Sequence, residues 1–169
     1  MTRSRQAVLS LIVATTVLLT GCNPFVSHRS IGVDATDVAT IEFYEYPWGE
    51  DTETVDRLTL VNSPDNREVI EEWVRSYTDM PLTPIGSNAI GDAIGKQAQG
   101  VRFTLTDGGA VDVTTIFVGR RDVIVIWQDG TVDRTDWGAP DLLAYYSEFG
   151  TVEQVDASER PQAELPGQR

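Results

Sequence analysis

Cysteine, histidine and lysine are almost absent from this chain of 169 residues, and each shortage excludes a class of site. The sequence holds one cysteine, Cys22, one histidine, His28, and one lysine, Lys96. A single thiol forms neither an intrachain disulfide nor a zinc site built from several thiolates. A single imidazole excludes a multi-histidine metal centre. We therefore expect a protein without a metal or another cofactor.

Positive charge is also scarce. The chain has 13 Lys and Arg residues against 26 Asp and Glu residues, which gives a formal net charge of −13. Binding to nucleic acid requires a basic surface opposite the phosphates, so this balance argues against a nucleic-acid partner. The length and the 41% of hydrophobic residues suit one domain with an ordinary core.

The first 22 residues differ in composition from the rest. Arg3 and Arg5 precede an almost wholly apolar stretch, Ala7–Leu19, which the residues Thr20-Gly21-Cys22 close. A run of this length is too short to cross a hydrocarbon core of about 30 Å. A positive start, an apolar middle and small residues at the end are typical of a secretory signal peptide.

The segment Leu19-Thr20-Gly21-Cys22 resembles the lipobox of bacterial lipoproteins. This resemblance covers residues 1–22 and implies cleavage between Gly21 and Cys22, with a diacylglyceryl group on the Cys22 sulfur. Two acyl chains make a stable membrane anchor, so we expect a lipid-anchored protein on the extracytoplasmic side of the cell membrane. The alternative is an ordinary secretory signal with a chance cysteine.

The remaining chain divides by composition. Residues 1–21 are expected to be the signal peptide, and residues 22–37, which lack sustained periodicity, a flexible tether. Residues 38–155 are expected to form a single domain. Residues 156–169, with Pro161 and Pro166 among polar residues, are expected to be a disordered tail.

Alternating apolar residues and turn sequences predict strands over most of the domain, and helical spacing predicts a helix over Pro64–Thr78, capped by Ser63. A short helix is expected from Pro140 to Phe149, with Leu142, Leu143, Tyr146 and Phe149 packed inward. Short turns require antiparallel pairing. The predicted fold is α+β, an antiparallel sheet of about six strands with the main helix on one face. The expected strands are residues 38–46, 55–61, 101–106, 110–118, 123–127 and 131–135.

The turn-rich strands and the hairpin Phe103-Thr104-Leu105-Thr106-Asp107-Gly108 make this layout similar to small uncharacterised lipoprotein domains of Gram-positive bacteria. That similarity implies no known site.

Residues 79–99 are expected to be a long loop, and long loops in compact domains are often functional. Its glycines and Lys96 do not have the spacing of a phosphate-binding loop. We therefore interpret it as a contact surface, with Asn88 and Lys96 as candidate binding residues.

Tyr44, Tyr46 and Trp48, at the end of the first predicted strand, are further candidate binding residues. Tyrosine and tryptophan dominate binding hot spots, but a strand aromatic is more often part of the core. The same two alternatives apply to Trp127 and Trp137, because these five aromatic residues are not all expected to fit one core.

Two groups of acids lie at predicted turns, Glu50, Asp51 and Glu53 in one and Asp129, Asp133 and Asp136 in the other. Clustered carboxylates bind calcium or perform acid–base chemistry. Neither group has the spacing of a calcium loop, so solvated turn acids are the preferred interpretation, and no catalytic residue is assigned.

These observations favour a non-enzymatic binding module of the cell envelope, whose partner is an envelope protein or a cell-wall component. Two alternatives remain open. One is a cell-wall hydrolase that uses carboxylates, and the other is an inhibitor or sensor that inserts the 79–99 loop into a partner.

Overall fold

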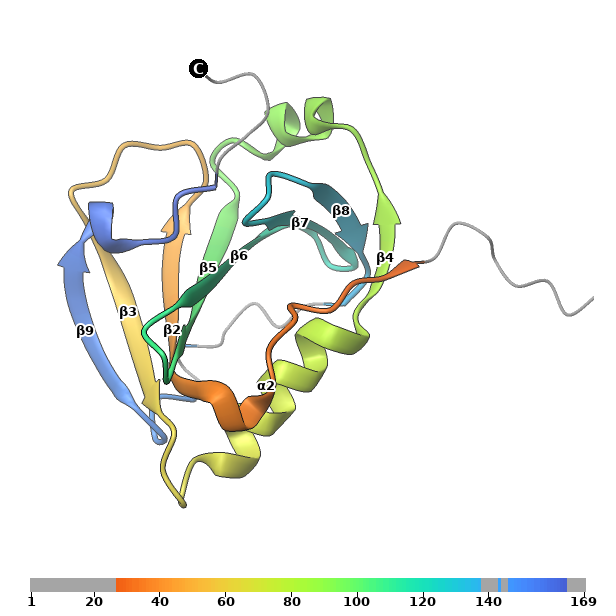
Figure 1. Ribbon diagram of the computed structural model, residues 1–169. Helices are drawn as coiled ribbons and strands as arrows, with labels where there is room; N and C mark the ends of the chain where they lie inside the picture. Colours follow the sequence, from red (N-terminus) through yellow and green to blue (C-terminus); the bar gives the residue numbers. More distant parts are fainter. Residues whose placement is uncertain (1–26, 138–142, 144–145, 164–169) are drawn as a thin grey trace, which may run out of the picture.

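The computed structural model describes residues 27–137, 143 and 146–163 (Figure 1). These residues form one sheet in the order β1-β4-β8-β7-β6-β5-β2-β3-β9, in which all neighbouring strands are antiparallel. Figure 1 shows β9 and β4 on opposite sides of the molecule and α2 (Arg67–Asp79) crossing between them. The strands are β1 (Ser27–His28), β2 (Val38–Pro47), β3 (Thr54–Val61), β4 (Pro81–Pro84), β5 (Gln97–Leu105), β6 (Ala110–Gly119), β7 (Asp122–Trp127), β8 (Val132–Thr135) and β9 (Thr151–Asp156).

The predicted class, α+β with an antiparallel sheet, is confirmed, but the described residues form nine strands and not about six. The six predicted strands are present as β2, β3, β5, β6, β7 and β8. The three additional strands lack a clear alternating pattern. β4 begins and ends with proline, which has no N–H to donate to a neighbouring strand. Because β4 pairs only briefly with β1 and β8, the missing donors remove few hydrogen bonds. β9 is an edge strand with one buried residue, Val155.

The main helix buries the predicted face, through Ile70, Trp73, Val74 and Tyr77. Its predicted start is wrong, because Pro64–Asn66 form a turn and the helix begins at Arg67. Asn66 is the N-cap but makes no side-chain capping bond. Its amide donates instead to the carbonyl oxygens of Val61, at 3.0 Å, and Phe149, at 2.9 Å, which ties the helix start to the segment before β9.

Both faces of the sheet are buried, and β2 shows how. Ile41 and Phe43 point to the face under α2, which we call the helix-covered face, and Tyr44 and Tyr46 point to the opposite one, the groove face. The buried residues of the helix-covered face are Ile31, Val38, Ile41, Phe43, Leu58, Leu60, Ile70, Trp73, Val74, Tyr77, Met80, Leu82, Val101, Phe103, Val113, Val125 and Trp127. Those of the groove face are Tyr44, Tyr46, Val55, Ile90, Ala93, Ala98, Ile116, Ile124, Ile126, Val132 and Val155.

The expected loop over residues 79–99 is wrong for most of its length. It contains β4 and the 3₁₀ helix η3 (Ser87–Ala93), and β5 already begins at Gln97. Ile90 and Ala93 of η3 are buried on the groove face. Gly86 precedes η3 and Gly95 follows it, so these two glycines separate β4, η3 and β5, of which only η3 lies over the sheet.

The expected tether and tail are also partly wrong. Within residues 22–37, β1 pairs with β4, Ile31 is buried in the core, and η2 (Ala35–Asp37) leads directly into β2. Within residues 156–163, the 3₁₀ helix η4 (Ala157–Glu159) follows β9 and Pro161 is buried against the sheet. Contacts with residues distant in sequence order both segments, so local composition does not reveal them.

Half of the predicted C-terminal helix, residues 140–142, 144 and 145, lies outside the described residues. Of its predicted inward side chains, Leu143, Tyr146 and Phe149 do pack against the helix-covered core. Leu142 lies outside the described residues. No helix of the described segments combines the length and apolar character needed to span a bilayer.

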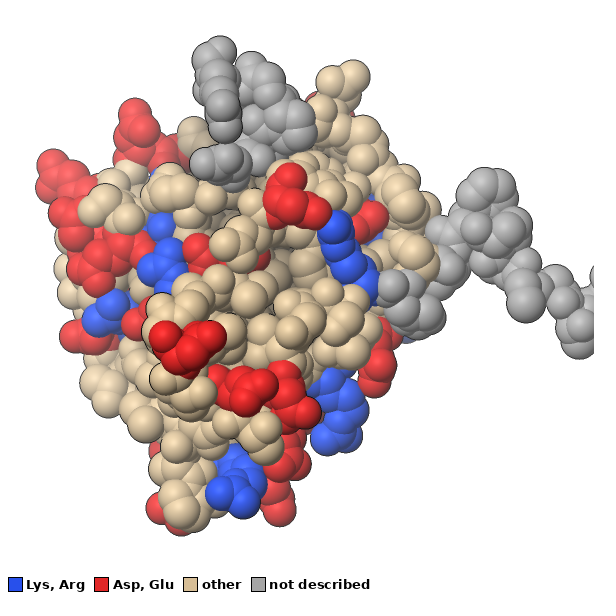
Figure 2. Space-filling model, in the orientation of Figure 1, with Lys and Arg blue, Asp and Glu red and all other residues tan. Residues whose placement is uncertain are grey.

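Acidic side chains outnumber basic ones in the sequence, and Figure 2 shows them spread over the visible face of the molecule. Several acids have a structural partner. Arg57 forms ion pairs with Glu153, at 2.6 Å, and Glu159, at 2.8 Å, and so joins β3 to β9 and η4.

Candidate functional site

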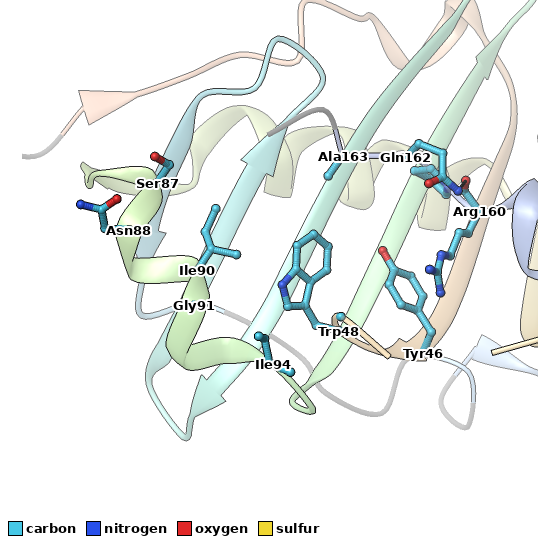
Figure 3. Close-up of a pocket in the computed structure, with 12 residues that line it drawn as sticks. Tyr46, Trp48, Ser87, Asn88, Ile90, Gly91, Ile94, Arg160, Gln162 and Ala163 are labelled. Atoms are coloured by element: carbon cyan, nitrogen blue, oxygen red, sulfur yellow. Dashed lines mark hydrogen bonds between the residues drawn. The ribbon is translucent and has the colours of Figure 1, made fainter. Parts of the chain in front are cut away.

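A groove of about 540 Å³ lies on the groove face of the sheet, between the end of β2, the 3₁₀ helix η3 and the segment 160–163 (Figure 3). Figure 3 shows the Trp48 ring between η3 and Tyr46, with Arg160 beside Tyr46. The lining residues are Tyr46, Trp48, Gly49, Ser87, Asn88, Ile90, Gly91, Ile94, Arg160, Pro161, Gln162 and Ala163.

The end of β2 supplies the aromatic residues of the groove. Trp48 follows the last residue of the strand, and its backbone is held from the other side of the groove. Its N–H donates to the Lys96 carbonyl oxygen at 2.7 Å, and its own carbonyl oxygen accepts from the Gly95 N–H at 2.7 Å. Gly49 turns the chain with a φ of +72°, a conformation that favours glycine. These bonds fix Trp48 relative to η3.

The helix η3 forms the second wall. Its side chains Ile90 and Ala93 are buried against the sheet, whereas Asn88 and the following residue, Ile94, remain exposed at the groove. Ile94 is 65% exposed. In the described segments, the exposed large hydrophobic side chains are Ile94, Val61 and Val152. An aliphatic side chain beside an accessible indole gives this wall an apolar character.

The segment after η4 forms the third wall. The Arg160 guanidinium lies over the Tyr46 ring, 4.4 Å from its centroid, and donates from Nη1 to Thr52 Oγ1 at 3.5 Å. Pro161 covers Gly100 so closely that a Cβ there would lie 2.9 Å from Pro161 Cδ. Glycine at position 100 is therefore what allows this segment to lie flat on the sheet.

The groove differs in charge from the rest of the chain. No Asp or Glu is among the described lining residues, although the chain has 26, and the one charged side chain among them is Arg160. Burial raises the pKa of Tyr46 above its usual value, opposed by a hydrogen bond with Thr114 and by the nearby Arg160 charge. Tyr46 is therefore a neutral phenol at physiological pH.

The groove brings together three of the five candidate binding residues, Tyr46, Trp48 and Asn88. The other two are not part of its lining. Tyr44 is buried, and its hydroxyl donates to Glu42 Oε2 at 3.2 Å. Lys96 contributes its backbone carbonyl to the Trp48 contact, and its exposed side chain lies outside the lining.

Sequence reasoning missed Ile94, Arg160 and Gln162, which line the same groove. Ile94 carried a weak signal, as an apolar residue in a segment rich in glycine. Arg160 and Gln162 carried none, because both were assigned to the tail. The other aromatic candidates, Trp127 and Trp137, pack on the helix-covered face.

The two acidic groups do not form a site in the described residues. Asp133 is buried and accepts a hydrogen bond from Trp127 Nε1 at 2.7 Å, whereas Asp129 pairs with Arg29 and caps the turn through the Thr131 N–H. Glu50, Asp51 and Glu53 are exposed. Within the described part of the chain, no group of three or more His, Cys, Asp or Glu residues is placed to hold a metal ion.

The predicted lipidation and cleavage residues, Cys22 and Gly21, lie outside the described residues. The comparisons with known proteins add no assignment to the groove or to the fold. The chain matches no family model, no curated protein and no solved structure among those compared.

Proposed function

We propose that this chain is a lipid-anchored, extracytoplasmic binding protein that uses the groove to hold a component of the cell envelope. The observation that carries the proposal is the groove itself, which Tyr46, Trp48 and Asn88 all line although η3 and β2 are far apart in sequence. Rigidly held aromatic side chains beside hydrogen-bonding groups are characteristic of binding sites.

The anchor limits where the partner lies. Because residues 27–37 belong to the fold, only residues 23–26 separate Cys22 from β1. Five residues of extended chain span at most about 17 Å. A protein lipidated at Cys22 therefore holds β1 within about 17 Å of its anchor, so its domain lies next to the membrane and its partner is expected in that layer of the envelope.

The hydrolase alternative has less support from the described residues. It required acids that converge on a substrate, and Asp133 is instead buried against Trp127. The inhibitor or sensor alternative required a long free loop at residues 79–99. That segment is occupied by β4 and η3, which favours a fixed wall of a binding site.

The experiment has two arms on the full chain expressed in a bacterium. In the first, Cys22→Ala is expected to abolish incorporation of a labelled fatty acid and to move the protein from the membrane to the soluble fraction. Labelling and membrane retention that survive Cys22→Ala would contradict the anchor.

In the second arm, a photo-crosslinking residue replaces Asn88 in the groove, and a matched control replaces Glu68 on the exposed side of α2. We expect a discrete adduct from position 88 that Trp48→Ala removes, and none from position 68. Equal labelling from both positions, or none from position 88, would contradict a binding role for the groove.

A further inference from the structure

We infer that the ligand of the groove is an N-acetylated glycan that carries a carboxylate. This inference rests on the proposed function of the groove as a binding site and names the chemistry of its occupant. It follows from three features of the lining, which are the lack of a free strand edge on β2, the polar groups and the charge.

An extended peptide has no strand to pair with in this groove. The aromatic residues come from β2, and β2 is flanked by β3 on one side and by β5 on the other, with pairing to β5 as far as Pro47↔Gln97. The other walls are a 3₁₀ helix and the segment 160–163. Main-chain pairing gives strand-addition sites their affinity, so this surface suits a ligand recognised through side chains.

The polar groups of the groove match a sugar. Among the described residues, neither the Ser87 hydroxyl nor the Asn88 amide has a protein hydrogen-bond partner. Both residues line the groove from η3, where the Asn88 amide lies at the outer end and points away from the Trp48 ring (Figure 3). A side-chain amide donates and accepts hydrogen bonds at the same time, which matches two neighbouring sugar hydroxyls or an acetamido group. The C–H face of a pyranose ring packs on an indole, while its edges bond to such groups.

The charge of the groove adds the carboxylate. Arg160 is the one ionised group among the described lining residues, and its described bond to Thr52 uses one of five guanidinium N–H donors. Stacking on Tyr46 holds the guanidinium plane, which leaves an edge to receive a carboxylate. A cationic ligand finds no acid among the described lining residues.

The size of the groove agrees with a short glycan segment. Its volume of about 540 Å³ lies within the range of pockets that hold molecules of disaccharide size. The apolar part of the lining, which includes Ile90 and Ile94, suits the methyl group of an acetamide. We therefore expect an acetamido sugar to bind better than the same sugar with a free hydroxyl.

The test uses the full lipidated chain in detergent micelles and follows the indole N–H resonance of Trp48 by NMR. The probes are a disaccharide that contains N-acetylmuramic acid, the neutral tetrasaccharide of N-acetylglucosamine, cellotetraose without acetamides, and an extended tetrapeptide. We expect the carboxylated disaccharide to bind most tightly, the neutral tetrasaccharide more weakly, and cellotetraose at least about tenfold more weakly still.

Three variants assign the contacts, and isothermal titration calorimetry measures their affinities, because two of the variants lack the Trp48 resonance. Trp48→Ala is expected to weaken binding of both acetamido sugars at least about tenfold, whereas Trp48→Phe keeps a ring and most of the affinity. Arg160→Gln is expected to abolish the preference for the carboxylated sugar but to retain binding of the neutral one. The near-ultraviolet circular dichroism of Trp48→Phe and Arg160→Gln checks that the fold is intact.

No response of Trp48 to either acetamido sugar at about 10 mM, equal affinity for cellotetraose, or tighter binding of the peptide would each overturn the inference. In those cases a crosslink from position 88 that depends on Trp48 would still support the groove as a binding site. Loss of that crosslink as well would remove the proposed function itself, so the two failures are distinguishable.

Discussion

The two faces of the sheet are both buried, but different kinds of structure cover them. On the helix-covered face, α2 places Trp73 against Phe43, with ring centroids 4.8 Å apart, and against Tyr146, at 5.5 Å. On the groove face, η3 and the segment 157–163 lie over the sheet and leave an open volume of about 540 Å³ between them. One face is packed continuously, and the other contains a groove.

This difference follows from the geometry of the covering elements. An α-helix presents a continuous stripe of side chains that fills the space above a sheet. A short 3₁₀ helix and an extended segment present fewer inward side chains, here mainly Ile90, Ala93 and Pro161, so a hollow remains between them. Stability is therefore expected to depend most on the helix-covered face, and binding on the groove face.

The largest effect is expected from truncation of the central aromatic residue of the helix-covered face. Trp73→Ala leaves a cavity among Phe43, Tyr77 and Tyr146 and is expected to lower the free energy of unfolding by about 3–5 kcal/mol. Chemical denaturation measures it. On the groove face, Ile94→Ala removes an exposed side chain and is expected to change stability by less than about 0.5 kcal/mol. Similar losses in both variants would erase the difference between the faces.

A smaller effect is expected at Gly100, beneath the segment that forms the third wall of the groove. A Cβ in Gly100→Ala meets the Pro161 ring and must displace it, at a cost of about 1–3 kcal/mol. Faster hydrogen exchange at residues 157–163, with α2 unchanged, is the expected signature. Gly86→Ala is the matched control, because nothing lies within 4 Å of its Cβ position. Unchanged exchange in Gly100→Ala would show that Pro161 does not hold this wall.

Alkaline pH compares a tyrosine from each face. Burial raises the pKa of Tyr77 far above its usual value, opposed by the Thr115 hydroxyl, and raises that of Tyr46 as well. Above about pH 10 the unfolded chain loses phenolic protons that the native state keeps, so the free energy of unfolding falls, by at most about 1.4 kcal/mol per pH unit for each tyrosine.

Phenylalanine variants separate the two contributions. Tyr77→Phe is expected to reduce the slope of stability against pH more than Tyr46→Phe does, because Tyr77 is the more strongly perturbed phenol. Denaturant titrations between pH 8 and 11 measure both slopes. The upper limit lies about one pH unit above the usual tyrosine pKa. A larger change of this slope in Tyr46→Phe than in Tyr77→Phe would show that the more strongly desolvated phenol lies on the groove face.

The smallest effect is expected from the ion pairs that hold β9 and η4. Glu153 and Glu159 are about half exposed, so Arg57→Gln is expected to cost about 1 kcal/mol or less. Screening is expected to shrink that difference in 1 M salt. A cost that does not depend on salt would indicate lost packing of the Arg57 side chain instead of lost charge.

The sequence predicted the elements whose pattern is local. Alternation in Ile41, Phe43 and Tyr44 predicted a strand with two distinct faces, and the spacing of Ile70, Trp73 and Tyr77 predicted the buried side of α2. It did not predict β4 or β9. Their pairing is decided by partners distant in sequence, and prolines or exposed polar residues obscure the pattern.

The candidate site was predicted in the same uneven way. Trp48 and Asn88 were selected because aromatic residues and long connections are common in binding sites, and both line the groove. Tyr44 was selected for the same reason but lies in the core, because both faces of the sheet are covered. Arg160 was missed, since only its contact with Tyr46 fixes its position.

Hydrogen–deuterium exchange of the full lipidated chain, with and without isolated bacterial peptidoglycan, tests the division of roles between the two faces most directly. We expect protection at residues 46–49, 87–94 and 160–163, which line the groove, and unchanged exchange in α2. Protection confined to α2 or to β9, with the groove residues unchanged, would contradict a binding role for the groove face.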